Sequence, residues 1–158
     1  YQTGEPIPAE IVERIIAAQN YLAAYLNVRQ LSFGLTDMAW HTITEPFEGD
    51  VEQFEVASMA PSLVLPVVPG TAMAPAFGHI FSGGYAAGYY GYKWAEVLEA
   101  DAFSLFKEKG IFNREVSGSF RENILSKGGT EHPMELYVRF RGHKPETKAL
   151  IEKMGLGK

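Results

Sequence analysis

Apolar residues recur at helical spacing over the first forty or so positions. One stripe comprises Ile11, Ile15, Ala18, Leu22 and Leu26, and a similar one continues through Val28, Leu31, Leu35 and Met38. Spacings of three, four and seven residues place side chains on one face of an α-helix. We therefore predict helix from Ala9 to about His41. Because such a helix would be longer than most in globular proteins, we expect a break or bend at Asn27 or Gly34.

The middle of the chain reads as one short helix followed by a loop. Asp50 precedes Gln53 by three residues, which resembles a capping box and predicts a helix that stops before Pro61. Prolines at three positions predict an extended loop over residues 63–75. The apolar run 63–68 suggests a buried, strand-like piece, although the prolines exclude a central strand.

Helical signals return in the second half. We predict a strong helix from about Gly88 to Lys109 with Gly110 as its C-cap, and a helix capped by Asn113 that runs to Lys127. Two short helices should begin near Pro133 and Pro145 and end at Gly142 and Gly155. Period-two alternation is absent, so the predicted fold is all-α, one domain over residues 1–158 with six to eight helices.

Composition narrows the function classes. Hydrophobic residues make up 46% of the chain, which indicates a folded protein and not a disordered segment. The net charge of −5 comes without a basic stripe, so we expect no nucleic-acid partner. The apolar stretches fall short of the roughly 20 residues that span a bilayer, so we expect no membrane partner. With no cysteine, thiolate catalysis and disulfides are excluded.

The start of the chain shows no targeting pattern. It opens with Tyr1 and lacks an initiator methionine, so we expect it to be part of a longer polypeptide. We expect that polypeptide to be cytoplasmic.

Residues 78–92 have an unusual composition. They hold four of the eight tyrosines, five glycines and His79, one of four histidines. Tyr85, Tyr89 and Tyr92 stand at i, i+4 and i+7, which is one face of a helix if the helix has begun. Phenol groups beside an imidazole, on a glycine-rich loop, form a donor-rich wall that suits a peptide carbonyl or a developing oxyanion.

Two other interpretations of this segment compete. The tyrosines can be amphipathic core residues, with glycines that let helices pack closely. A phosphate-binding loop is disfavoured, because the Walker lysine and a preceding strand are both missing.

The segment Phe77–Glu96 resembles the C-terminal signature of the thimet oligopeptidase family, with the closest likeness to its oligopeptidase A and peptidyl-dipeptidase branches. The opening residues 1–8, the region Asp37–His41 and residues 139–142 also resemble that family. The resemblance covers nearly the whole chain. It implies a zinc metallopeptidase that hydrolyses short peptides.

The resemblance also implies where zinc would be bound. In the family, two histidines of an HExxH helix and a glutamate of a following helix hold zinc, and the motif's own glutamate activates water. This chain has no HExxH, since His41, His79, His132 and His143 are scattered. We therefore expect zinc in the full-length enzyme, no metal ligand here, no activity of this chain alone, and a partner in the missing N-terminal part of the same polypeptide.

Roles carry over residue by residue onto the motif. The resemblance assigns catalytic, transition-state-binding roles to His79, Tyr85 and Tyr92. It assigns substrate-binding roles to Tyr89 and to the loop glycines Gly83 and Gly84. A different class of function stays open, namely a non-catalytic helical module that binds peptides with the same fold.

The remaining charged residues have simpler interpretations. We expect His41 to interact with the C-terminus of its helix or to pack there, and His132 to cap a helix. Glu96, Glu99 and Asp101 should lie on a solvated or ion-paired helix face. Arg139 and Arg141 are left outside the predicted site.

Overall fold

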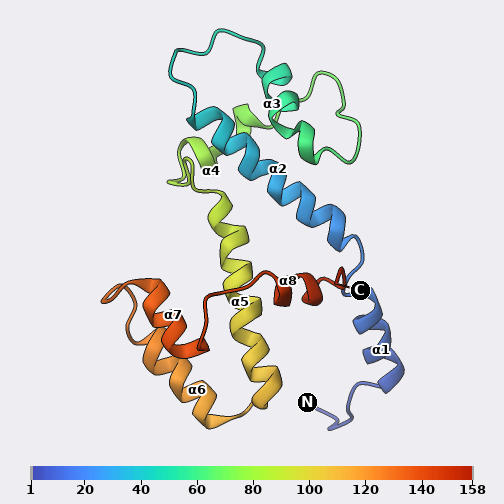
Figure 1. Ribbon diagram of the computed structural model, residues 1–158. Helices are drawn as coiled ribbons and strands as arrows, with labels where there is room; N and C mark the ends of the chain where they lie inside the picture. Colours follow the sequence, from blue (N-terminus) through green and yellow to red (C-terminus); the bar gives the residue numbers. More distant parts are fainter. Residues whose placement is uncertain (1, 158) are drawn as a thin grey trace.

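The computed structural model describes residues 2–157, so that only Tyr1 and Lys158 lie outside it, and all its regular structure is helical (Figure 1). The helices are α1 (Ala9–Ala18), α2 (Ala23–His41), α3 (Val51–Met59), α4 (Gly78–Phe81), α5 (Tyr90–Lys109), α6 (Arg114–Phe120), α7 (Pro133–Arg141) and α8 (Lys148–Lys153). Short turns of 3₁₀-helix cover Ala60–Ser62 and Ala74–Ala76, and a π-turn, Arg121–Leu125, extends α6. The predicted all-α fold is confirmed.

The N-terminal helical segment breaks earlier than predicted. Residues 19–22 separate α1 from α2, and Leu22 takes a left-handed backbone conformation (φ 57°). Asn27 does not interrupt α2, and its side-chain amide donates to the carbonyl of Ala23 within the helix (2.8 Å). Gly34 does not either. A Cβ there would stand 3.9 Å from the backbone of Tyr90, so the glycine lets α5 begin close to α2.

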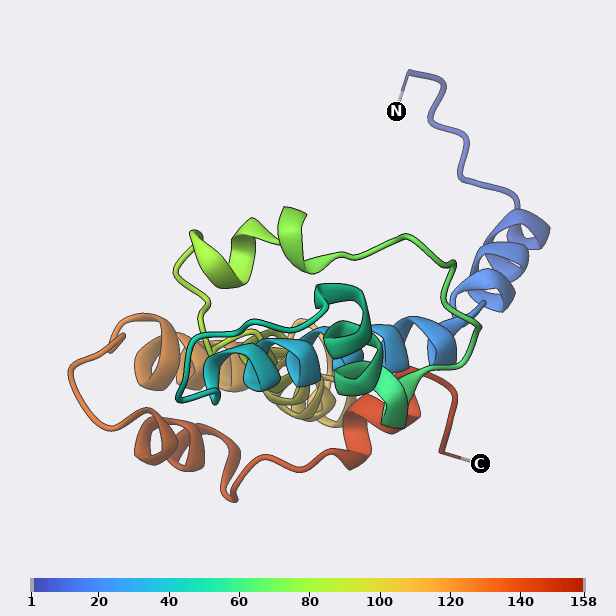
Figure 2. The same ribbon diagram turned by 90° about the horizontal axis from the view of Figure 1, so that it is seen from above.

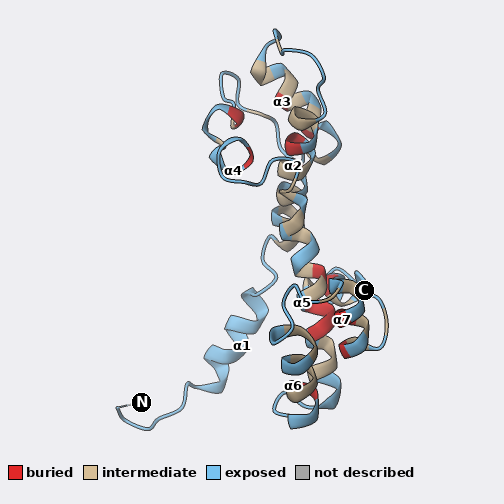
Figure 3. Cartoon of the chain, turned by 90° about the vertical axis from the view of Figure 1, so that its left-hand side faces the viewer, coloured by how far each residue is buried: buried red, intermediate tan, exposed pale blue. Residues whose placement is uncertain are grey.

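Helix α1 stands away from the rest of the described chain. All of its residues are exposed, and in Figure 3 it is uniformly pale blue beside two groups of helices that contain buried positions. Figure 2 also shows it projecting beyond the other helices. The apolar stripe that predicted this helix, including Ile11 and Ile15, is therefore not packed against the described residues.

Helix α2 packs against α3 on one side and against α5 on the other, and α4 lies just before the start of α5 (Figures 1 and 3). Asp50 caps α3 as predicted, since its carboxylate accepts from the Gln53 amide (2.8 Å). Residues 63–73 form a loop, as predicted, but the apolar run within them is not a buried strand. Val64, Leu65 and Val68 are each at least 60% exposed.

The orientation of α2 also differs from expectation. Its apolar residues Leu31 and Leu35 are 49% and 41% exposed, whereas Thr36 and Asp37 are fully buried. The Thr36 hydroxyl donates a hydrogen bond to the carbonyl of Ser32 within the helix (2.9 Å). Asp37 has partners outside the helix, which are described below.

The second half of the chain contains the larger hydrophobic core. Helix α5 packs against α6 and α8, and α7 packs against the π-turn after α6. Ala102, Val116, Tyr137 and Phe140 form one buried cluster, and Val97, Ala100 and Leu150 form a second. The predicted caps hold: Gly110 ends α5 at φ 107°, and the Asn113 side chain accepts from two amides of α6.

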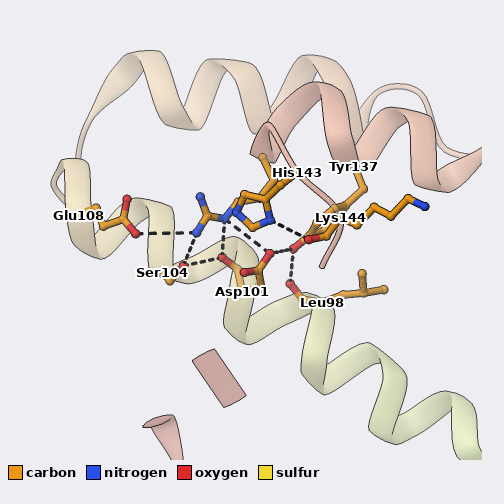
Figure 4. A network of polar contacts seen from close by, with 8 residues as sticks. Leu98, Asp101, Ser104, Glu108, Tyr137, His143 and Lys144 are labelled. Carbon is orange, nitrogen blue, oxygen red and sulfur yellow. Dashed lines mark hydrogen bonds and ion pairs between the residues drawn. The ribbon is translucent and has the colours of Figure 1, made fainter. Parts of the chain in front are cut away.

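A polar network joins α5 to α7 inside this core (Figure 4). The Tyr137 hydroxyl donates to Asp101 Oδ2 (2.6 Å), and the Arg141 guanidinium lies 3.5 Å from the same carboxylate. Burial, and then hydrogen bonding to Asp101, raises the pKa of Tyr137 well above its usual range. Asp101 was expected on a solvated or ion-paired face. It is ion-paired, but it is only 3% exposed.

Candidate functional site

Four aromatic residues from three consecutive segments converge beside α2. His79 lies on α4, Tyr85 on the following loop, Tyr89 at the N-cap of α5 and Tyr92 in its first turn. The ring centre of His79 is 5.5 Å from Tyr85, 6.2 Å from Tyr89 and 6.2 Å from Tyr92. We call these four residues the tyrosine wall. The structure thus brings together all four of the aromatic residues that the sequence singled out.

The wall is not the single helix face that the spacing suggested. Helix α5 begins only at Tyr90, so Tyr85 belongs to the loop before it. The loop folds back so that the Tyr85 ring stacks on Tyr92, with ring centres 5.0 Å apart and an interplanar angle of 27°. Both residues are 39% exposed, so the stacked pair lies at the surface of the described chain.

Tyr89 occupies the inner edge of the wall. Its ring contacts Phe33 and Phe77 at centre distances of 5.8 and 5.3 Å, and its hydroxyl donates to Gln30 Oε1 on α2 (3.1 Å). Burial raises the pKa of Tyr89, and the nearby positive charge of Arg29 partly offsets that effect. The Tyr89 hydroxyl is therefore paired with a side chain of α2 at the inner edge of the wall.

The pKa of Tyr92 is raised, first by hydrogen bonding with the Tyr85 phenol and then by burial. A tyrosine titrates near pH 10 in water, so a raised pKa keeps the phenol protonated throughout the neutral range. Tyr92 therefore remains a hydrogen-bond donor at neutral pH.

The double glycine shapes the loop between α4 and α5. A Cβ on Gly83 would stand 2.9 Å from the carbonyl oxygen of His79, which is closer than carbon and oxygen can approach. Gly84 has φ 81°, a left-handed conformation that glycine adopts without strain. Both glycines are thus needed for the turn that returns Tyr85 to His79, and the Tyr85 amide donates to the His79 carbonyl (3.2 Å).

Sequence reasoning missed the residue beneath this loop. The buried carboxylate of Asp37, on α2, accepts from the backbone amides of Ala87 and Tyr89. The sequence shows only an acidic residue within a predicted helix. Hydrophobicity alone does not reveal that this residue lies on the buried face. Asp37 was noted only as part of a resemblance.

The other charged residues considered in the sequence have structural partners. His132 caps α7, since its Nδ1 accepts from the Met134 amide (3.2 Å). His41, at the end of α2, pairs with Asp37. Side-chain pairs join Glu96 to Lys93, Glu99 to Lys153, and Arg139 to Glu131.

The described residues do not fit a zinc site. Over residues 2–157, no group of three or more His, Asp or Glu side chains is arranged to hold a metal ion. His79 lies among phenol rings, and carboxylates do not surround it in the wall. Over the same residues, no helix combines the length and hydrophobicity needed to cross a bilayer.

Two open grooves lie near these features. One of about 430 Å³ runs between α2, α3 and the loop 62–73, and it includes Phe33, which also contacts the tyrosine wall through Tyr89. The other, of about 530 Å³, is almost wholly apolar and lies over α5, α6 and α7, where it continues the hydrophobic core. A smaller pocket of about 50 Å³ is lined by Tyr89 and Tyr92 of the wall and by Gln30 of α2.

The chain is similar in sequence to several known peptidases. It is 49% identical to oligopeptidase A of Escherichia coli over 157 residues, 48% identical to oligopeptidase A of Salmonella typhimurium over 159, and 38% identical to dipeptidyl carboxypeptidase of Escherichia coli over 158. Each alignment covers 99% of this chain but 23% of the relative, so the chain spans about a quarter of their length. The model of peptidase family M3 matches residues 1–156. The chain therefore belongs to peptidase family M3.

Proposed function

We propose that this chain is the C-terminal portion of a zinc metallo-oligopeptidase, and that it supplies the surface that binds the peptide and its transition state. The observation that carries the proposal is the convergence of His79, Tyr85, Tyr89 and Tyr92 into one exposed wall. Membership of family M3 supports peptide hydrolysis as the reaction. In this proposal the chain forms one helical domain of a cytoplasmic protein.

The chemistry of peptide hydrolysis explains why such a wall is useful. When water adds to a peptide carbonyl, the carbonyl oxygen becomes an oxyanion, and fixed donors that bind it more tightly than the carbonyl lower the barrier. Tyr85 and Tyr92 place two phenol groups side by side, with ring centres 5.0 Å apart. His79 adds an imidazole at the same surface. We assign transition-state binding to these three residues.

Tyr89, Gly83 and Gly84 have a supporting role in this proposal. Tyr89 lines the inner edge of the wall, where its ring packs between Phe33 and Phe77. The glycines shape the loop beside the substrate, and their lack of side chains leaves room for varied peptides. We assign substrate binding to Tyr89 and to the two glycines, whose turn also places Tyr85.

The proposed enzyme needs zinc, and the described residues contain no group of three or more side chains arranged to hold it. When bound, zinc supplies an activated water and polarises the substrate carbonyl. We propose that the remaining part of the same polypeptide holds it, and that this chain alone is inactive. Stoichiometric zinc in the purified chain, with peptide hydrolysis blocked by a chelator, would contradict this assignment.

Tyrosine-to-phenylalanine changes in the full-length enzyme test the proposal. Tyr85→Phe or Tyr92→Phe keeps the ring and its packing but removes the donor, so kcat should fall on the order of a hundredfold to a thousandfold, with KM much less affected. Tyr90→Phe is a matched control, because Tyr90 is adjacent, 61% exposed and outside the wall. Steady-state kinetics with one short peptide gives these values.

The competing functions predict different results. If the tyrosines only pack, both Tyr→Phe variants would keep normal turnover and Tyr→Ala variants would lower thermal stability. If the chain is a non-catalytic peptide-binding module, the full-length protein would bind short peptides and hydrolyse none. Either result would overturn the proposed function.

A further inference from the structure

Asp37 links α2 to the loop that carries the tyrosine wall. Its carboxylate is fully buried, and each oxygen accepts from a different backbone amide. Oδ1 accepts from Ala87 (2.9 Å) and Oδ2 accepts from Tyr89 (2.8 Å), fifty and fifty-two positions along the chain. Charge-assisted bonds of this kind are stronger than those between neutral groups.

His41 completes the surroundings of this carboxylate. Its Nδ1 lies 2.8 Å from both the Asp37 carbonyl oxygen and Asp37 Oδ1. Because a carbonyl oxygen can only accept, Nδ1 must carry a hydrogen and donate to Asp37. The imidazole also lies against the Phe81 ring, at a centre distance of 5.6 Å, in the last residue of α4. Asp37 therefore has donors from α2 itself and from the loop.

The loop needs such an anchor at one particular residue. Ala87 has φ 51°, a left-handed conformation that is unfavourable for an L-residue with a side chain. The Asp37 bond to the Ala87 amide stabilises that conformation. The next turn follows at once, since the Gly88 amide donates to the Tyr85 carbonyl (2.8 Å). The left-handed residue thus fixes how the chain passes from Tyr85 into α5.

We propose that Asp37 is a positioning residue for the tyrosine wall. By binding the amides on both sides of Gly88, it holds Tyr85 in register with Tyr92 and fixes the start of α5. Asp37 touches no substrate in this proposal and acts through the placement of the Tyr85 phenol. The inference rests on the proposed function, because the cost of a misplaced phenol is a loss of turnover.

Asp37→Asn in the full-length enzyme is the test. Asparagine has the shape of aspartate but only one acceptor oxygen, so its NH₂ group would face a backbone N–H. We expect kcat to fall about tenfold to a hundredfold, with little change in KM. A loss of this size is typical when a catalytic group moves by up to about one ångström. Amide hydrogen exchange within residues 82–90, read by mass spectrometry, should become faster in the same variant.

Asp101→Asn is the matched control. Asp101 is also a buried carboxylate that accepts a side-chain hydrogen bond, but its partners lie in the α5–α7 core. This variant should lower thermal stability yet leave kcat and the exchange of residues 82–90 unchanged at temperatures where it is folded. A similar loss of kcat in both variants would show a general stability effect and overturn the proposal.

A double variant tests whether Asp37 acts through Tyr85. If it does, the fall in kcat caused by Asp37→Asn should nearly vanish in a Tyr85→Phe background, because that phenol is already absent. Fully additive losses would overturn the proposed route. If Asp37→Asn speeds exchange while Tyr85→Phe and Tyr92→Phe keep normal turnover, the loop anchor stands and the proposed function fails.

If the Asp37→Asn variant does not fold, the His41→Phe variant tests the same proposal. Phenylalanine keeps a ring against Phe81 and removes one donor to Asp37, so a smaller loss of kcat, about threefold to tenfold, should accompany faster exchange at residues 82–90. Unchanged kcat and exchange in this variant would overturn the positioning role.

Discussion

The two halves of the molecule bury different kinds of side chain. In the site region, formed by α2, α3, α4 and the loops up to residue 89, four polar residues are buried, and two of them, Asp37 and Glu55, are carboxylates. In the core region, formed by α5–α8, the buried residues are mainly apolar, and Asp101 is the charged exception. In Figure 3 the site region lies in the upper part of the molecule and the core region in the lower part.

The two regions bury different side chains because their backbone amides find hydrogen-bond partners in different ways. Helices satisfy most of their own amides, so the packed faces of α5–α8 can be apolar. Residues 63–74 and 82–89 have few such internal bonds, and buried carboxylates accept hydrogen bonds from some of their amides instead. Glu55 binds the amides of Met73 and Ala74 just as Asp37 binds those of Ala87 and Tyr89. A site built on loops is thus held by acidic residues on neighbouring helices, whereas the core region is held by contact between apolar side chains.

The largest expected effect concerns the core region. Phe140 is 6% exposed within a cluster of apolar residues from α5, α6 and α7. Phe140→Ala should lower the free energy of unfolding by about 3–5 kcal/mol, through lost burial and the cavity that remains. Urea unfolding of the chain measures this. Phe112→Ala, at a 96% exposed position, is the matched control and should change stability by less than about 0.5 kcal/mol.

The next effect concerns the site region and should stay local. Glu55→Gln leaves one acceptor for the Met73 and Ala74 amides, and the lost charge-assisted bonds are worth about 1.5–3 kcal/mol. Hydrogen exchange at these amides should rise roughly tenfold to a hundredfold. Glu52→Gln is the control, since Glu52 accepts only from the exposed amide of Gly70 (2.9 Å). If hydrogen exchange at the amides of α5 rose by the same factor, the effect would not be local to the site region and the prediction would be wrong.

The sequence predicted the core region well. Its helix ends are encoded locally, by Asn113 at the start of α6, Pro133 at the start of α7, and glycines after α5 and α7. Such caps act through bonds within a few residues, so no knowledge of tertiary packing is required. The same holds for Asp50 at the start of α3.

The site region was predicted in part. The tyrosines and His79 could be singled out by composition, and the structure brings them together. Their true arrangement could not be read from spacing, because Tyr85 precedes the helix and is returned by Gly83 and Gly84. The role of each residue in catalysis stays a prediction.

Helix α2 shows why the rest could not be predicted. Its apolar stripe suggested which face is buried, yet Leu31 and Leu35 are exposed and Asp37 is buried. Hydrophobic periodicity cannot reveal a face whose buried group is a carboxylate bound to amides fifty residues away. The break between α1 and α2 was missed for a similar reason, since Leu22 in a left-handed conformation has no sequence signal.

The smallest expected effect tests the one buried charge of the core region. Tyr137→Phe removes the hydroxyl that donates to Asp101 but leaves Arg141 as its partner, so stability at pH 7 should fall by about 1 kcal/mol. Tyr21→Phe, at a 76% exposed ring, controls for loss of a hydroxyl at that pH and should have no effect.

The effect of Tyr137→Phe on stability should also depend on pH. The pKa of Tyr137 is raised in the folded state by burial and by Asp101, so above about pH 10 the unfolded chain releases a proton that the folded chain retains. The folded state then binds more protons than the unfolded state, and stability falls as pH rises. The Tyr137→Phe variant has no such proton, so the stability advantage of the parent over this variant should be constant up to about pH 9 and shrink above pH 10. Urea unfolding at pH 7, 9 and 10.5 measures the difference. A gap that widened with pH would mean that the phenolate, and not the phenol, is the form that the core region stabilises.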